Sequence, residues 1–64
     1  MSPLLVLQAR AEARAMLYAG GEFDLERALA PLLTYALRSG VVDELGAERS
    51  FAIIRAAFVR VAKL

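Results

Sequence analysis

The side chains that most often carry enzyme chemistry are missing from this sequence. Its 64 residues include no histidine and no cysteine, which removes the usual general base, the commonest metal ligand and the thiolate nucleophile. The remaining hydroxyl groups belong to Ser2, Tyr18, Thr34, Tyr35, Ser39 and Ser50. No spacing pairs any of them with a base, and Ser50, in the first turn of a predicted helix, is expected to hydrogen-bond the local backbone. The sequence therefore predicts a protein that is not an enzyme and needs no cofactor.

One acidic cluster imitates the opening of a calcium-binding loop. Glu22, Asp24 and Glu26 alternate along the chain as the first ligands of such a loop do. The loop also needs glycine at its sixth position and a bidentate glutamate at its twelfth, where this chain has Arg27 and Leu33. We interpret the cluster as the acidic N-terminus of a helix and predict no metal site.

A basic segment near the C-terminus offers an alternative function. A helix over residues 47–63 would place Arg49, Arg60 and Lys63 on one side, where they could contact nucleic-acid phosphates. An acidic excess over residues 20–46 balances this segment, and the net charge of the chain is only +1. We therefore expect the basic side chains to face solvent or the acidic stretch, and expect no nucleic-acid binding at physiological salt.

Length and composition restrict the class of protein. A chain of 64 residues is one domain. Because a chain of this size hides only about 60% of the surface that its unfolded form exposes, its stability is marginal without a staple such as a disulfide, a metal or a partner chain. Residues 28–37 form the longest uncharged run, far short of a membrane span and interrupted by Pro31. The chain shows no targeting segment. These features predict a cytoplasmic protein that does not bind membranes, and seven arginines against one lysine are typical of bacterial GC-rich genes.

The predicted fold is an all-α, three-helix bundle with helices over residues 3–19, 25–39 and 47–63. Ser2 and Asp24 precede the first two helices as N-caps, and Gly20-Gly21 and Gly40 follow them as stops. Residues 41–46 are expected to form a connector whose apolar side chains plug one end of the bundle.

Pro31 falls inside the second predicted helix, where it removes a hydrogen bond to the carbonyl of Arg27. Because Arg27 is expected to face solvent, water could satisfy that carbonyl, and the helix should bend around the core. A break at Ala30 into two short helices is the alternative.

The apolar stripes of the second and third helices predict the core. On the second helix the stripe consists of Leu25, Leu29, Leu32, Leu33 and Ala36. On the third helix, spacings of four and three residues select Ala47, Phe51, Ile54, Phe58 and Val61. We expect Phe51, Ile54, Phe58, Leu29 and Leu32 in particular to be largely buried.

The first helix carries two apolar stripes on roughly opposite sides, at about 100° per residue. One consists of Leu5, Val6, Ala9, Ala13, Met16 and Leu17, and the other of Leu4, Leu7, Ala11, Ala15 and Tyr18. Between them run Gln8 and Glu12 on one side, and Arg10 and Arg14 on the other. One stripe suffices to pack a helix on its own small domain, so the second is expected to meet a partner.

We assign the second stripe, Leu4, Leu7, Ala11, Ala15 and Tyr18, to the interface of a two-fold homodimer, because its alanines allow close approach. The sequence therefore predicts a small, non-enzymatic, self-associating helical interaction or accessory protein of bacterial type. It does not identify any further protein partner.

Overall fold

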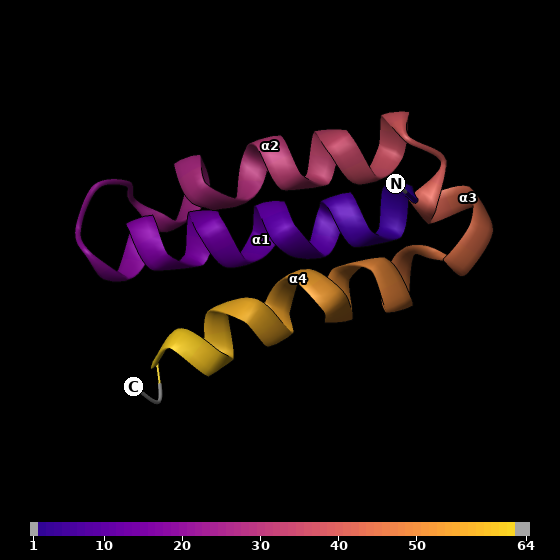
Figure 1. The fold of residues 1–64 in the computed structure, drawn as a ribbon. Coiled ribbons are helices and arrows are strands. Elements are labelled where there is room, and N and C mark those ends of the chain that lie inside the picture. Colours follow the sequence, from indigo (N-terminus) through magenta and orange to yellow (C-terminus); the bar gives the residue numbers. More distant parts are fainter. Residues whose placement is uncertain (1, 63–64) are drawn as a thin grey trace.

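The computed structural model describes residues 2–62, which form four α-helices (Figure 1). Helix α1 spans Pro3–Ala19, α2 Leu25–Arg38, α3 Val41–Leu45 and α4 Ala47–Ala62. The all-α bundle and its three long helices agree with the sequence prediction. The predicted end of the last helix at Lys63 lies outside the described residues.

Local sequence signals explain where the helices begin and end. The side chains of Ser2 and Asp24 accept hydrogen bonds from the backbone amides of Leu5 (3.2 Å) and Arg27 (2.8 Å), as expected of N-caps. Gly40 ends the second helical segment with a φ of 88°, in the left-handed region that glycine adopts without strain.

The predicted connector over residues 41–46 is wrong in one respect, because Val41–Leu45 forms a short helix, α3. Gly40 and Gly46, both with positive φ, flank this short helix and let the chain change direction at each of its ends. Val41 is buried in the core and Leu45 packs against it. The expected plug at the end of the bundle is therefore present, in helical form.

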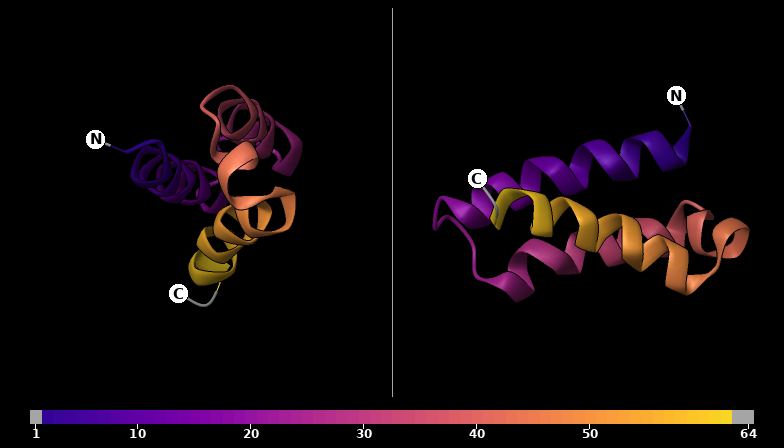
Figure 2. Two further views of the ribbon diagram at one scale, coloured as in Figure 1. Left: turned by 90° about the vertical axis from the view of Figure 1, so that its right-hand side faces the viewer. Right: turned by 90° about the horizontal axis from the view of Figure 1, so that it is seen from below.

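Helix α1 lies to one side of α2 and α4 and contacts both (Figure 2). The other two long helices pack more closely on α1 than on each other, and they run in opposite directions. Helix α3 joins them at one end of the bundle. The α2–α4 side of the bundle is consequently the least closed.

Small side chains dominate the buried core. Its members are Leu7, Ala11, Ala15, Ala28, Leu32, Ala36, Val41, Ser50, Ile54 and Ala57. Burial of Leu32 and Ile54 confirms two predicted core residues, and Leu29 and Phe58 are half-buried. The prediction is wrong for the exposed residues Leu25, Leu33, Ala47 and Phe51. The alanines let helix backbones approach closely. Four larger side chains, Leu7, Leu32, Val41 and Ile54, complete the core, whereas Leu25, Leu33 and Phe51 lie at its flanks.

Helix α2 continues unbroken through Pro31, so the alternative of two short helices is wrong. The Arg27 carbonyl, which loses its helical donor to the proline ring, accepts a hydrogen bond from Arg14 Nη2 at 2.7 Å. Arg14 Nε also donates to the carbonyl of Ala28 at 2.8 Å. A side chain of α1, and not water as we expected, satisfies the defect in α2; the predicted bend of the helix stays a prediction.

Candidate functional site

The stripe assigned to a dimer interface turns out to face the interior of the same chain. Leu7, Ala11 and Ala15 are fully buried, Leu4 is half-buried, and the ring of Tyr18 lies 5.7 Å from that of Phe58 on α4. The interface prediction is therefore wrong for Leu7, Ala11 and Ala15, whereas for half-buried Leu4 and for Tyr18, which is 40% exposed, it stays a prediction. Its alanines do permit a close approach, but the helices that approach are α2 and α4.

The two polar lines beside this inner stripe are used to hold α1 in place. On one side Arg10 stacks over the ring of Tyr35, and Arg14 over that of Phe23, at 4.5 and 4.6 Å. On the other side Glu12 forms an ion pair with Arg60 of α4 at 2.9 Å. One polar line thus faces α2 and the other faces α4, which directs the outer stripe of α1 away from the bundle.

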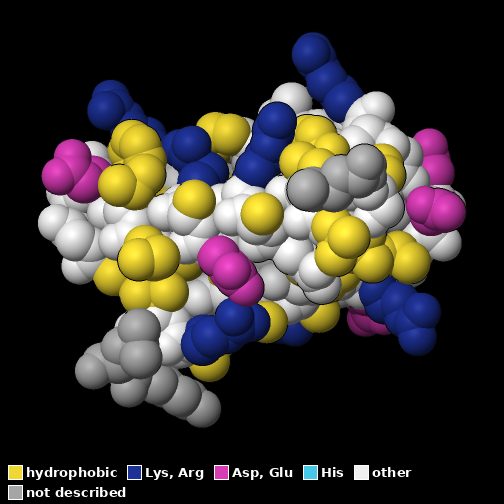
Figure 3. Space-filling model, in the orientation of Figure 1, with side chains coloured by type: hydrophobic (Ala, Val, Ile, Leu, Met, Phe, Trp, Pro, Cys, Tyr) yellow, Lys and Arg dark blue, Asp and Glu magenta, His cyan; other side chains and the backbone are white. Residues whose placement is uncertain are grey.

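The outer stripe of α1, defined as Leu5, Val6, Ala9, Ala13, Met16 and Leu17, is one apolar surface of the molecule, exposed at every position except half-buried Val6. Met16 is 67% exposed and Leu5 54%. On the α1 side of the molecule, apolar side chains stand in separate groups with arginine and acidic side chains among them (Figure 3). Two of the six residues are alanines, so this surface offers little continuous apolar area.

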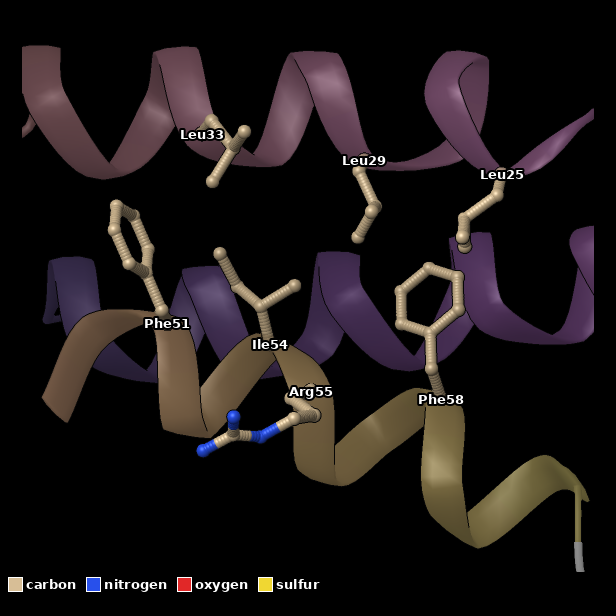
Figure 4. Close-up of a pocket in the computed structure, with 7 residues that line it drawn as sticks. All are labelled: Leu25, Leu29, Leu33, Phe51, Ile54, Arg55 and Phe58. Atoms are coloured by element: carbon tan, nitrogen blue, oxygen red, sulfur yellow. The ribbon is translucent and has the colours of Figure 1, made fainter. Parts of the chain in front are cut away.

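The second exposed apolar surface is a groove between α2 and α4 with a volume of about 360 Å³. Leu25, Leu29 and Leu33 form one wall, and Phe51, Ile54 and Phe58 form the other (Figure 4). We call these six residues, together with Arg55, the α2–α4 groove. Leu25 and Phe51 remain 47% and 46% exposed, although both were predicted to lie in the core.

A single charged side chain, Arg55, lines the groove among the described residues. Its guanidinium group points away from the apolar walls, on the α4 rim (Figure 4). The groove therefore offers a partly exposed apolar surface with one positive charge at its edge.

The alternative nucleic-acid face is only partly available in this arrangement. Arg60 is paired with Glu12, whereas Arg49 is exposed; Lys63 lies outside the described residues. Within residues 2–62 this ion pair joins α4 to α1, so the pairing that we expected between the basic segment and the acidic stretch is not found there.

The residues that we considered as candidates for catalysis or metal binding either have structural roles or lie apart from one another. Ser50 is buried and its hydroxyl donates a hydrogen bond to the Gly46 carbonyl at 2.8 Å, as predicted. Asp24 caps α2. Over the described part of the chain, no three acidic side chains gather where they could hold a metal ion, and no helix is long and apolar enough to cross a membrane.

The sequence contained a signal for the groove that stripe analysis overlooked. The apolar face of α2 extends around the helix axis from Ala28 to Leu33 and is wider than contact with one neighbouring helix requires. Its alanines occupy only one part of this face. The side of α2 that carries the alanines Ala28 and Ala36 is the one that can approach α1 closely. The leucines further round the helix, Leu29 and Leu33, then belong to a second surface, whereas Leu25 falls between Ala28 and Ala36 and its place in the groove had no such signal.

Comparison of the chain with known protein families, with curated proteins and with solved structures finds no match.

Proposed function

We propose that this protein is a small, non-enzymatic helical interaction protein of bacterial type that acts by self-association. One observation supports the proposal most: among the described residues of so small a chain, nine large apolar side chains are exposed. They are Leu5, Met16, Leu17, Tyr18, Leu25, Leu33, Leu37, Phe51 and Val59. Soluble monomers rarely leave extended apolar patches uncovered. A partner chain would also supply the burial that a domain of this size lacks.

The nucleic-acid alternative has weaker support. Specific and non-specific binders both depend on several unpaired cations that contact phosphates, and Arg60 is already engaged with Glu12. Phe58 of α4 is half-buried in the α2–α4 groove, and Phe51, which lies near Arg49 and Arg55, is the one α4 aromatic that could stack on a base. Interaction with protein is therefore the function that we propose.

Sedimentation equilibrium over a concentration range of about 1–100 µM tests this proposal. We expect the mass to rise with concentration from 6.9 kDa towards that of a dimer, because association buries the exposed apolar side chains. A mass that stays at 6.9 kDa throughout the range would contradict self-association.

A further inference from the structure

Gly46 is the only residue between α3 and α4, and the chain changes direction at it (Figure 1). Its backbone has a φ of 87° and a ψ of 159°, a conformation that is essentially restricted to glycine. Because of this turn the two helices are not joined by hydrogen bonds: over the described residues, the amides of residues 47–49 donate to no backbone carbonyl. A helical conformation at Gly46 would merge α3 and α4 into one helix over residues 41–62 and form these missing hydrogen bonds.

On such a merged helix the apolar sides of α3 and α4 would face in nearly opposite directions. At about 100° per residue, Ile54 lies about 180° from Leu45 and about 140° from Val41 around the helix axis. In the present fold Val41 and Ile54 are both buried in one core, and Leu45 packs against it. In the merged helix the α3 segment can keep its place on its own bundle. The apolar side of the α4 segment then turns away from that bundle and needs another surface.

We propose that two copies of this chain associate by exchanging α4 through the merged helix, so that each α4 packs on the α1 of the other copy. The contacts that α4 makes with α1 in one chain are then rebuilt between two chains, and the interface needs no new complementary surface. The inference rests on the self-association proposed above and assigns its mechanism. The occupant of the exposed α1 surface is therefore a second copy of this chain.

The contacts between α1 and α4 are suited to this exchange. Helix α4 packs mainly on α1, and it meets α2 only across the partly open α2–α4 groove. Ile54 and Ala57 of α4 belong to the same buried cluster as Ala11 of α1. Glu12 adds an ion pair with Arg60 at 2.9 Å. Because apolar burial and a charge pair are combined, this surface of α1 selects α4 of the same sequence in preference to an arbitrary apolar helix.

Alanine substitution of two glycines tests the exchange by sedimentation equilibrium. At Gly46 and at Gly40 an added Cβ would meet no atom within 4 Å, so each substitution acts through the backbone conformation. Gly46→Ala disfavours the turn and favours the merged helix, and should lower the dissociation constant of the dimer roughly hundredfold, about tenfold for each chain. Gly40 has a φ of 88° but lies in the turn between α2 and α3, which the exchange keeps. Gly40→Ala should therefore leave the dissociation constant unchanged.

A mixing experiment with two charge variants tests which chains are in contact. Glu12→Arg and Arg60→Glu each place like charges between α1 and α4. In an exchanged heterodimer α1 of either variant meets α4 of the other, so opposite charges meet at both contacts. Native mass spectrometry of an equimolar mixture should show the heterodimer in about fivefold excess over the statistical proportion, a modest effect because the pair is exposed. A dimer formed through any other surface keeps this pair within one chain and should mix statistically.

The outcomes separate the exchange from self-association itself. A wild-type chain that sediments as a monomer at every concentration would overturn the proposed function and the exchange together. A wild-type dimer that Gly46→Ala does not tighten, and whose charge variants mix statistically, would overturn the exchange alone. Circular dichroism checks the helix content of Gly46→Ala, and the mixing experiment does not depend on the folding of that variant.

Discussion

The contacts of α1 with its two neighbours and the groove between α2 and α4 are built from different sizes of apolar side chain. In the closed core around α1, two leucines, Leu7 and Leu32, are buried together with five alanines, Ala11, Ala15, Ala28, Ala36 and Ala57. Where α2 faces α4, the walls are three leucines, two phenylalanines and Ile54. The first region is closed to solvent, and the second is a groove with half-exposed leucine and phenylalanine side chains.

This difference indicates that the share of small side chains, and not apolar character alone, affects which surfaces of this bundle close. Helix axes approach to about 8–10 Å depending on the side chains at the contact. Alanines at the α1 contacts permit the shorter approach and leave no gap. Large side chains facing each other across α2 and α4 keep those helices apart and stay partly in water. The closed contacts should therefore govern the stability of the single chain, to which the groove should contribute little.

The largest effect should separate two adjacent leucines of α2. Leu32 is 1% exposed and Leu33 37%, so Leu32→Ala should lower the free energy of unfolding by about 2–5 kcal/mol and Leu33→Ala by less than about 1 kcal/mol. Urea denaturation checks this at protein concentrations where the sedimenting mass is that of one chain. Equal losses for the two variants would contradict the distinction between the closed contacts and the groove.

A smaller effect should follow from enlarging an alanine at a closed contact. Ala15→Leu inserts a larger side chain at a fully buried position of α1 and should lower the free energy of unfolding by about 1–3 kcal/mol through overpacking. Ala13→Leu, on the exposed outer stripe of the same helix, should change stability by no more than about 0.5 kcal/mol, because leucine and alanine are both good helix formers. Thermal or urea unfolding of the pair measures the difference. If Ala15→Leu is as stable as Ala13→Leu, close approach at α1 is not what closes the core.

The smallest effect concerns the polar edge of the α1–α2 contact. Arg14→Met removes the hydrogen bonds to the carbonyls of Arg27 and Ala28 and should cost about 1 kcal/mol, because Arg14 is only half-buried. The loss should shrink in a Pro31→Ala background, where a restored backbone N–H supplies a donor to the Arg27 carbonyl. A double-mutant cycle measured by urea denaturation isolates this coupling. Additive losses would show that Arg14 does not compensate for Pro31.

The sequence by itself determined the helices and their ends to within a residue over most of the chain. Ser2, Asp24 and Gly40 act within one turn of their own position, so their effect needs no tertiary context. Periodicity also identified two opposed stripes on α1 with polar lines between them. Helix α1 indeed buries the middle of one stripe, Leu7, Ala11 and Ala15, and leaves all of the other except half-buried Val6 exposed. It could not identify α3, because five residues between two glycines are too few to show a helical period.

Only the tertiary structure decided which stripe of α1 faces inward, which leucines of α2 close the core and what satisfies the Arg27 carbonyl. Each of these depends on how near two helices come and from which side. Periodicity specifies the direction of a side chain about its own helix axis, but it contains no distance to another axis. That distance follows from the sizes of side chains contributed by two helices at once. For this reason Ala11 and Ala15, which sequence analysis placed at a partner chain, lie in the core, while Phe51 lies on the surface.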